Sequence, residues 1–168
     1  MFFKNNIYKN KKNSSMNRLY QIIFTKSSFE LDKEYERLSD HEKVDIANMT
    51  PDSFFDFNDN EGHYRLYLIF SPIDIERYSK ILNSNFIRHE ALDISDKVLE
   101  NKICFDSDLR PFINALNRFK WNSFKVKVDE WIYENLDMDL VLDRIGQCGM
   151  DNLRPVEKKF LRNFQNEK

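Results

Sequence analysis

The sequence predicts an α+β fold, with a small mixed sheet of about four strands covered by helices and a C-terminal helical extension. Short apolar runs rich in β-branched and aromatic residues alternate with longer segments in which apolar residues recur at helical spacing. The 168 residues are enough for one domain, or two at most. Apolar residues make up 41% and charged residues 32% of the chain, which is the balance of a folded protein rather than a disordered one.

Four segments are predicted to be strands. They are residues 18–25, 64–70, 86–92 and 123–128. The first two are nearly apolar throughout, which is typical of central strands. In the last, Phe124, Val126 and Val128 alternate with lysines, which indicates a strand with one face in water.

Helices are predicted from capping residues and from apolar spacing. They lie near residues 40–47, 72–83, 109–120, 129–135, 139–147 and 155–164, with a further short one after residue 50. Ser39 and Glu42 have the spacing of a capping box. Thr50 is expected to cap the short helix, with Pro51 at its first position.

Within the predicted helix 109–120, we expect Phe112, Leu116 and Phe119 to face the core. The order of elements is compatible with a ferredoxin-like arrangement, although the hairpin between its middle strands is not evident. The predicted organisation is a disordered basic leader at 1–15, an α+β core domain at 16–128 and a helical extension at 129–168 packed on or beside the core.

Composition excludes several classes of chemistry. Three glycines cannot form a phosphate-binding loop, and neither the P-loop nor the dinucleotide-binding pattern occurs. Cys104 and Cys148 are too few for a cysteine-rich zinc site, and we expect both to be reduced in a cytoplasmic protein. No apolar run reaches the roughly 20 residues that span a bilayer. We therefore predict no cofactor, no metal, no catalytic residue and no membrane partner.

Carboxylates and histidines are the residues from which an enzyme could still be built. A metal-dependent nuclease or hydrolase could use Asp93, Asp96, Asp106 and Asp108, but carboxylates before helices are more simply explained as caps. The histidines are His41, His63 and His89, and no two of them have helical ligand spacing.

The distribution of charge is uneven although the net charge is only −2. Residues 27–62 hold eleven acidic and three basic side chains, a formal charge of −8. Leu31, Tyr35 and Leu38 recur there at helical spacing, and so do three phenylalanines further on, so we interpret the block as helices with solvated acidic faces.

The leading hypothesis is a non-enzymatic protein that binds another protein or assembly, as a regulator, inhibitor or accessory subunit. The candidate partner-binding residues are Trp121, Trp131, Phe160 and Phe164, because aromatic residues are enriched at interface hot spots. The amphipathic stretch of Trp131, Ile132 and Leu136 favours a place in the core for Trp131 over a role as an exposed anchor.

The alternative hypothesis is nucleic-acid binding by residues 109–128, which contain five basic residues and no acidic one. The candidates are Arg110, Arg118, Lys120, Lys125 and Lys127. Bases of this kind neutralise phosphates, and the aromatic residues between them could stack on nucleobases. The simpler interpretation is that the aromatics face the core and the basic groups face water.

Overall fold

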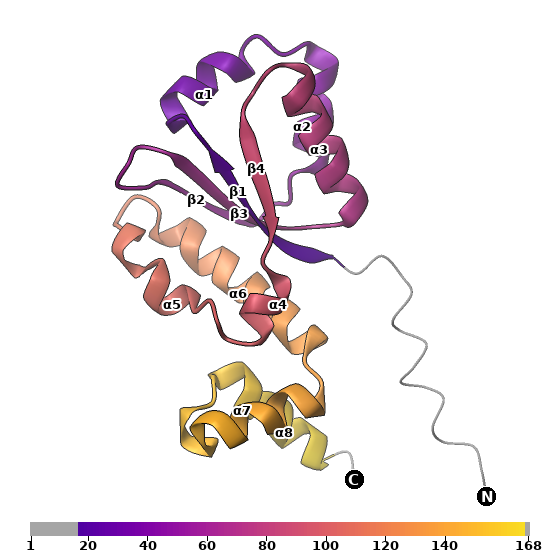
Figure 1. Ribbon diagram of the computed structural model, residues 1–168, viewed down its shortest axis with the longest axis vertical. Helices are drawn as coiled ribbons and strands as arrows, with labels where there is room; N and C mark the ends of the chain where they lie inside the picture. Colours follow the sequence, from indigo (N-terminus) through magenta and orange to yellow (C-terminus); the bar gives the residue numbers. More distant parts are fainter. Residues whose placement is uncertain (1–16, 167–168) are drawn as a thin grey trace, which may run out of the picture.

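The computed structural model describes residues 17–166, so the predicted leader at 1–15 lies outside the described residues. Within them, four strands form one sheet in the order β2-β3-β1-β4 (Figure 1). They are β1 (Arg18–Phe24), β2 (Phe54–Asn58), β3 (Tyr64–Phe70) and β4 (His89–Asp93). The sheet is antiparallel throughout rather than mixed, because each helical crossover joins two strands that have a third strand between them.

The α+β class predicted from the sequence is confirmed, and the topology is the double split β-α-β arrangement called ferredoxin-like. The middle hairpin that the sequence does not reveal is formed by β2 and β3. Asp59 closes its turn by accepting hydrogen bonds from the amides of Glu61 (3.0 Å) and His63 (2.9 Å). Gly62 takes a φ of 81° in the same turn, a conformation that favours glycine.

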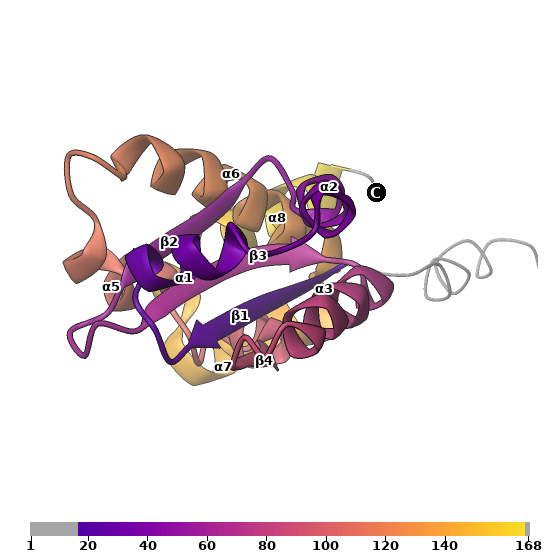
Figure 2. The ribbon, with the colours of Figure 1, turned by 90° about the horizontal axis from the view of Figure 1, so that it is seen from above.

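Three helices cover one face of the sheet: α1 (Ser28–Tyr35), α2 (Asp40–Met49) and α3 (Pro72–Ser84). Figure 2 shows them nearest the viewer when the molecule is seen from above. Capping boxes begin the first two, with Ser27 paired to Glu30 and Ser39 paired to Glu42 as predicted. Alternate strand residues such as Ile22 pack against these helices in one apolar cluster.

The second face is covered by α4 (Ser95–Leu99), α5 (Phe105–Asp108), the 3₁₀ turn η1 (Arg110–Phe112) and the long helix α6 (Arg118–Asn135). Helix α6 buries Trp121, Phe124 and Val128 against the sheet. The Phe55 ring on β2 contacts Trp121 edge-on, with 5.1 Å between ring centroids. Helix α6 is therefore part of the core and not an addition to it.

The C-terminal part contains α7 (Met138–Cys148), the 3₁₀ turn η2 (Met150–Asn152) and α8 (Pro155–Asn166). These elements lie beyond the end of α6, away from the sheet (Figure 1). Val141, Leu153 and Val156 are buried and join the cluster that α6 forms with the sheet. The extension predicted from residue 129 is real as a group of helices, but a boundary at 128/129 falls inside α6.

The segment after residue 50 forms a strand instead of the predicted short helix. Thr50 ends α2 instead of beginning a new helix, because its amide and its hydroxyl both donate to the carbonyl of Ile46. Pro51 then stops the helix, since proline cannot continue it. The phenylalanines that follow form β2, with Phe55 buried on one face and Phe54 packed on the other.

The secondary structure of residues 109–128 also differs from the prediction. The predicted strand 123–128 is the middle of α6, and the predicted helix 109–120 is η1 and a turn up to residue 117, with α6 beginning only at Arg118. The alternation of valine and lysine also fits a helix, because Phe124 and Val128 are four residues apart and share a helical face. Val126 is then turned outward and is 57% exposed, whereas Val128 is 1% exposed.

Candidate protein-binding surface on helix α6

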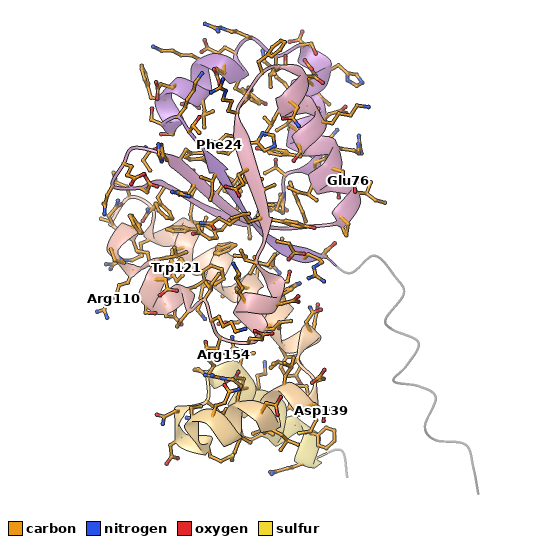
Figure 3. All side chains as sticks on the ribbon, viewed as in Figure 1. Phe24, Glu76, Arg110, Trp121, Asp139 and Arg154 are labelled. Atoms are coloured by element: carbon orange, nitrogen blue, oxygen red, sulfur yellow. The ribbon has the colours of Figure 1, made fainter. Side chains whose placement is uncertain are left out.

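The two tryptophans proposed as partner anchors lie in the core, which corrects that proposal. Trp121 is 8% exposed and Trp131 is 6% exposed. The Trp131 indole donates its Nε1 hydrogen to the carbonyl of Asn17, 2.8 Å away, so its polar edge is satisfied inside the protein. Figure 3 shows Trp121 enclosed between the sheet and the helices.

The two phenylalanines of α8 lie nearer the surface. Phe160 is half-buried against the Tyr133 ring, with 5.9 Å between ring centroids. Phe164 is 40% exposed. The four predicted anchors are thus divided between the core and α8, and they do not form one surface.

The basic residues predicted to contact phosphates are also divided. Lys120 is paired with Asp56 at 3.0 Å and Lys127 with Glu130 at 2.8 Å. The hydrogen bond to Glu130 raises the pKa of Lys127. Lys125 is paired with Asp129 at 2.6 Å and with Asp106 at 3.6 Å. Most of this positive charge is therefore neutralised by acids that lie far away in sequence or on the next helical turn.

Arg110 and Arg118 are different, because neither makes an ion pair or a side-chain hydrogen bond with the described residues. Both are exposed. Figure 3 shows the Arg110 side chain extending away from the body of the protein. These two guanidinium groups are available to a partner, while three of the five predicted bases are already engaged.

Large apolar side chains are exposed beside these arginines. Leu116 is 95% exposed, Phe119 is 85% exposed and Val126 is 57% exposed. Phe119 and Val126 are seven residues apart and share one side of α6, and Leu116 lies in the turn just before the helix. We call this set the α6 ridge, together with Arg118, which precedes Phe119, and Arg110, which lies on η1 before the turn. Single exposed apolar residues are common, but several large ones close together along the chain mark a candidate interaction site.

The turn before α6 holds the ridge in place. Asn114 accepts hydrogen bonds from the amides of Leu116 (2.9 Å) and Asn117 (3.2 Å), and Asn117 accepts one from the amide of Asn114 (2.8 Å). These reciprocal bonds close the turn at 114–117, which leads directly into α6 at Arg118. The amide of Arg118 also bonds the carbonyl of Asn114 at 3.0 Å, so Leu116 lies within a hydrogen-bonded turn. Leu116 is therefore exposed on ordered backbone.

A second group of exposed residues lies on α1, on the opposite face of the sheet. Phe29 is 67% exposed, and Asp32 and Glu36 follow it at the i, i+3 and i+7 spacing of one helical face. Neither carboxylate makes a side-chain hydrogen bond or an ion pair with the described residues. We call these three residues the α1 stripe. Lys33 lies over the Phe29 ring at 4.3 Å, so the stripe is acidic but not purely so.

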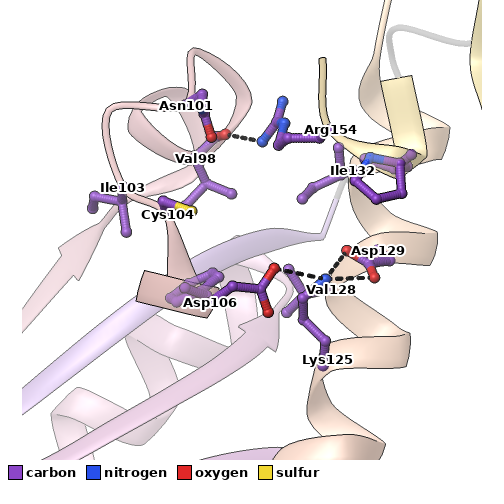
Figure 4. Close-up of a pocket in the computed structure, with 13 residues that line it drawn as sticks. Val98, Asn101, Ile103, Cys104, Asp106, Lys125, Val128, Asp129, Ile132 and Arg154 are labelled. Atoms are coloured by element: carbon purple, nitrogen blue, oxygen red, sulfur yellow. Dashed lines mark hydrogen bonds and ion pairs between the residues drawn. The ribbon is translucent and has the colours of Figure 1, made fainter. Parts of the chain in front are cut away.

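A small pocket of about 70 Å³ lies where the α4–α5 loop, α6 and the start of α8 meet (Figure 4). Lys125 spans its rim, with its Nζ 2.6 Å from Asp129 and 3.6 Å from Asp106. On the other side, Arg154 donates to the carbonyl of Val98 at 2.7 Å. This volume is far below the roughly 300 Å³ of an ordinary small-molecule site, so the pocket does not indicate a substrate.

The carboxylates proposed for a metal-dependent enzyme do not form one site. Arg18 binds both Asp93 (2.6 Å) and Asp96 (3.3 Å). Asp106 is bound by Lys125, while Asp108 accepts a hydrogen bond from the amide of Cys104 at 2.9 Å. These contacts explain the four carboxylates as ion-pair partners and turn-stabilising groups.

Within residues 17–166, one group has three ligand atoms close enough for a metal ion, namely Asp59, Glu61 and His63 in the β2–β3 turn. The sequence analysis did not identify it. Burial of Asp59 by itself raises its pKa, but hydrogen bonds from Arg65 and from the amides of His63 and Glu61 outweigh that effect and hold the pKa below its ordinary value. Asp59 is thus already satisfied by Arg65 and the turn, and it has a structural role.

Comparisons with protein-family models, with curated proteins and with solved structures find no match to this chain. In the part of the chain that the structure describes, no helix is both long and apolar enough to cross a bilayer.

The α6 ridge is the feature that the sequence analysis missed, since it placed Leu116 and Phe119 in the core. The two asparagines at 114 and 117 are the signal that could have located it, because they form a turn after which the helix begins at Arg118 instead of 109. From that start, Trp121, Phe124 and Val128 form the buried stripe and Phe119 falls outside it.

Proposed function

We propose that this protein works by binding another protein through the α6 ridge, without catalysing a reaction. The observation that carries the proposal is the exposure of Leu116 (95%), in a turn closed by side-chain hydrogen bonds, and of Phe119 (85%), at the start of α6. An apolar group that is already ordered loses little conformational entropy when a partner covers it. Arg110 and Arg118 at its edge would favour a partner that carries acidic groups.

The contacts of the three histidines support a function without catalysis. Among the described residues, no histidine hydrogen-bonds a cysteine or a serine, which is the contact that activates a nucleophile. His41 lies 3.5 Å from Asp45, and the His89 Nδ1 lies 3.0 Å from the carbonyl of Ile87. His63 faces the acids of its own turn. These contacts support a structural role for each histidine.

A second candidate function is binding of single-stranded nucleic acid, favoured by exposed Phe119 beside unpaired Arg118. An aromatic ring and a free guanidinium could stack on a base and neutralise a phosphate. Two observations make it weaker than protein binding. Lys120, Lys125 and Lys127 are paired with acids, and the aromatic face of the sheet that could stack bases is covered by α6.

Site-specific photo-crosslinking tests the proposed function. A photoreactive phenylalanine analogue replaces Phe119 in one sample and Phe86 in the other, because Phe86 is 90% exposed but lies at the end of α3. We expect position 119 to crosslink one protein and position 86 to give no crosslink. Equal crosslinking at both positions contradicts a specific site at the ridge, and a nucleic-acid adduct at 119 supports the second candidate instead.

Paired substitutions complete this test. Leu116→Ala with Phe119→Ala should abolish capture of the partner and leave the unfolding free energy within about 0.5 kcal/mol of the original, because both side chains are exposed. If the double variant retains the partner, the ridge is not the binding surface.

A further inference from the structure

We propose that the partner of the α6 ridge is a second copy of this chain, which docks through its α1 stripe. This inference rests on the proposed function, because it names the partner of the same surface. The two surfaces are complementary in chemistry. The ridge offers Phe119 beside Arg118, and the stripe offers Phe29 beside Asp32 and Glu36.

The charges on the two surfaces are not used inside the molecule. Among the described residues, the guanidinium groups of Arg110 and Arg118 make no ion pair, and neither do the carboxylates of Asp32 and Glu36, although the Lys43 ammonium donates to the backbone carbonyl of Glu36 at 3.0 Å. Elsewhere in the described structure, many exposed charges are paired, as with Lys127 and Glu130. Contact between copies would place the free guanidinium groups opposite the free carboxylates, which steers association and fixes its orientation.

The apolar residues make the same contact favourable. Phe29 and Phe119 are 67% and 85% exposed. Asp32 and Glu36 follow Phe29 by three and seven residues, and Val126 follows Phe119 by seven, so each ring shares a helical face with these side chains. Two such helical faces can pack together with their aromatic rings near the centre and their charges at the edge. This is the arrangement of a small interface with an apolar centre and a polar rim.

A single copy cannot bring the two surfaces together. Helix α1 packs on one face of the sheet and α6 on the other, as Figure 1 shows with the strands between them. The contact is therefore heterologous, with a different surface used by each copy. A heterologous contact leaves one free ridge and one free stripe on every pair, so further copies can add until a ring closes or a filament grows.

Sedimentation velocity of charge-reversal variants tests this inference. One variant carries Arg110→Glu and Arg118→Glu, and the other carries Asp32→Lys and Glu36→Lys. A control variant carries Lys80→Glu and Arg88→Glu, two exposed bases that lie outside both surfaces and have no partner among the described residues. All four side chains on the two proposed surfaces are exposed and unpaired, so the fold is expected to tolerate their reversal.

We expect the original chain to sediment as a monomer at about 10 µM and as species larger than a dimer at several hundred µM, because the contact is small and weak. Each surface variant alone should weaken association at least about 10-fold, since like charges then face each other. An equimolar mixture of the two should associate again, because each reversed surface meets its complement. The control should behave like the original chain.

Salt provides an independent measurement. Raising the salt from about 0.1 M to about 1 M shortens the screening length from about 10 Å to about 3 Å, so association of the original chain should fall. A chain that stays monomeric at every concentration overturns the inference, and so does a mixture of variants that fails to associate. If the chain is monomeric while position 119 still crosslinks a different protein, the inference fails and the proposed function stands.

Discussion

Arg154 and Glu157 form an ion pair with 2.6 Å between Nη2 and Oε1, and the Glu157 side chain is completely buried. The second carboxylate oxygen of Glu157 accepts a hydrogen bond from the Arg154 amide at 2.8 Å, so it also caps the first turn of α8. The Arg154 guanidinium donates to the carbonyls of Val98 and Leu99 at the end of α4. This pair therefore connects the C-terminal helices to the α+β body.

Removing Glu157 should destabilise the protein strongly. Glu157→Ala leaves the Arg154 charge largely buried without its partner, which costs about 3–5 kcal/mol. Urea unfolding followed by circular dichroism measures the loss. The double variant Arg154→Met with Glu157→Leu should lose less than Glu157→Ala, because it also removes the buried Arg154 charge and leaves only Arg144, which lies 4.0 Å from Glu157, without this partner. A double variant that is less stable than the single one would contradict this account.

Phe86 should be replaceable with a gain in stability. It has a φ of 59° at the end of α3, where its amide bonds the carbonyl of Asn83 and the amide of Ile87 bonds that of Leu82. This is a Schellman motif, in which glycine is favoured at the left-handed position. The Phe86 side chain is 90% exposed and contributes little packing.

We therefore expect Phe86→Gly to raise the unfolding free energy by about 1 kcal/mol, because glycine has no Cβ to strain the left-handed backbone. Thermal unfolding measures the change. Phe86→Ala is the matched control, because it removes the ring and keeps the Cβ, and it should give little or no gain. Equal stabilisation by both variants would assign the effect to the ring instead of the backbone.

Two valines of α6 distinguish a helix from the strand that the sequence predicts. In a strand, Val126 and Val128 lie on the same face, whereas in α6 they are 57% and 1% exposed. Val126→Asp should change the unfolding free energy by less than about 1 kcal/mol, while Val128→Asp should cost several kcal/mol or prevent folding, since it buries a charge. Similar losses for both would indicate the strand.

Buried tyrosines should make the protein less stable in alkali. Burial raises the pKa of Tyr78 to about 12, above its ordinary value of 10.0. The neutral phenol is therefore favoured in the folded state. Below about pH 10 the phenol is neutral in both states, and its contribution to the free energy of unfolding is complete. As the pH rises from about 10 to about 12, the unfolded chain releases its proton first and this contribution is lost.

Tyr78→Phe should reduce this alkaline loss. The Tyr78 hydroxyl makes no hydrogen bond with the described residues, so the substitution itself should have little effect at neutral pH. Urea midpoints measured at about pH 8 and at about pH 11 give the comparison. An unchanged difference between the two pH values in the variant would mean that Tyr78 does not contribute.

Local patterns in the sequence determined several elements correctly. The apolar runs at 18–25 and 64–70 are strands β1 and β3, and the capping box of Ser39 and Glu42 begins α2. Ser71 and Pro72 begin α3, and residues 139–147 and 155–164 are helical. These signals depend on neighbouring residues alone, so the sequence contains all the information they need.

The α6 ridge and the β2–β3 hairpin were decided by tertiary structure. The segment from Phe54 to Asn58 is a strand because β3 supplies its hydrogen-bond partners and Trp121 covers Phe55. Residues 123–128 fit either a strand or a helix locally, and the buried partners of Phe124 and Val128 select the helix. The same choice turns Phe119 to the surface, because a helix that buries one face must expose the other.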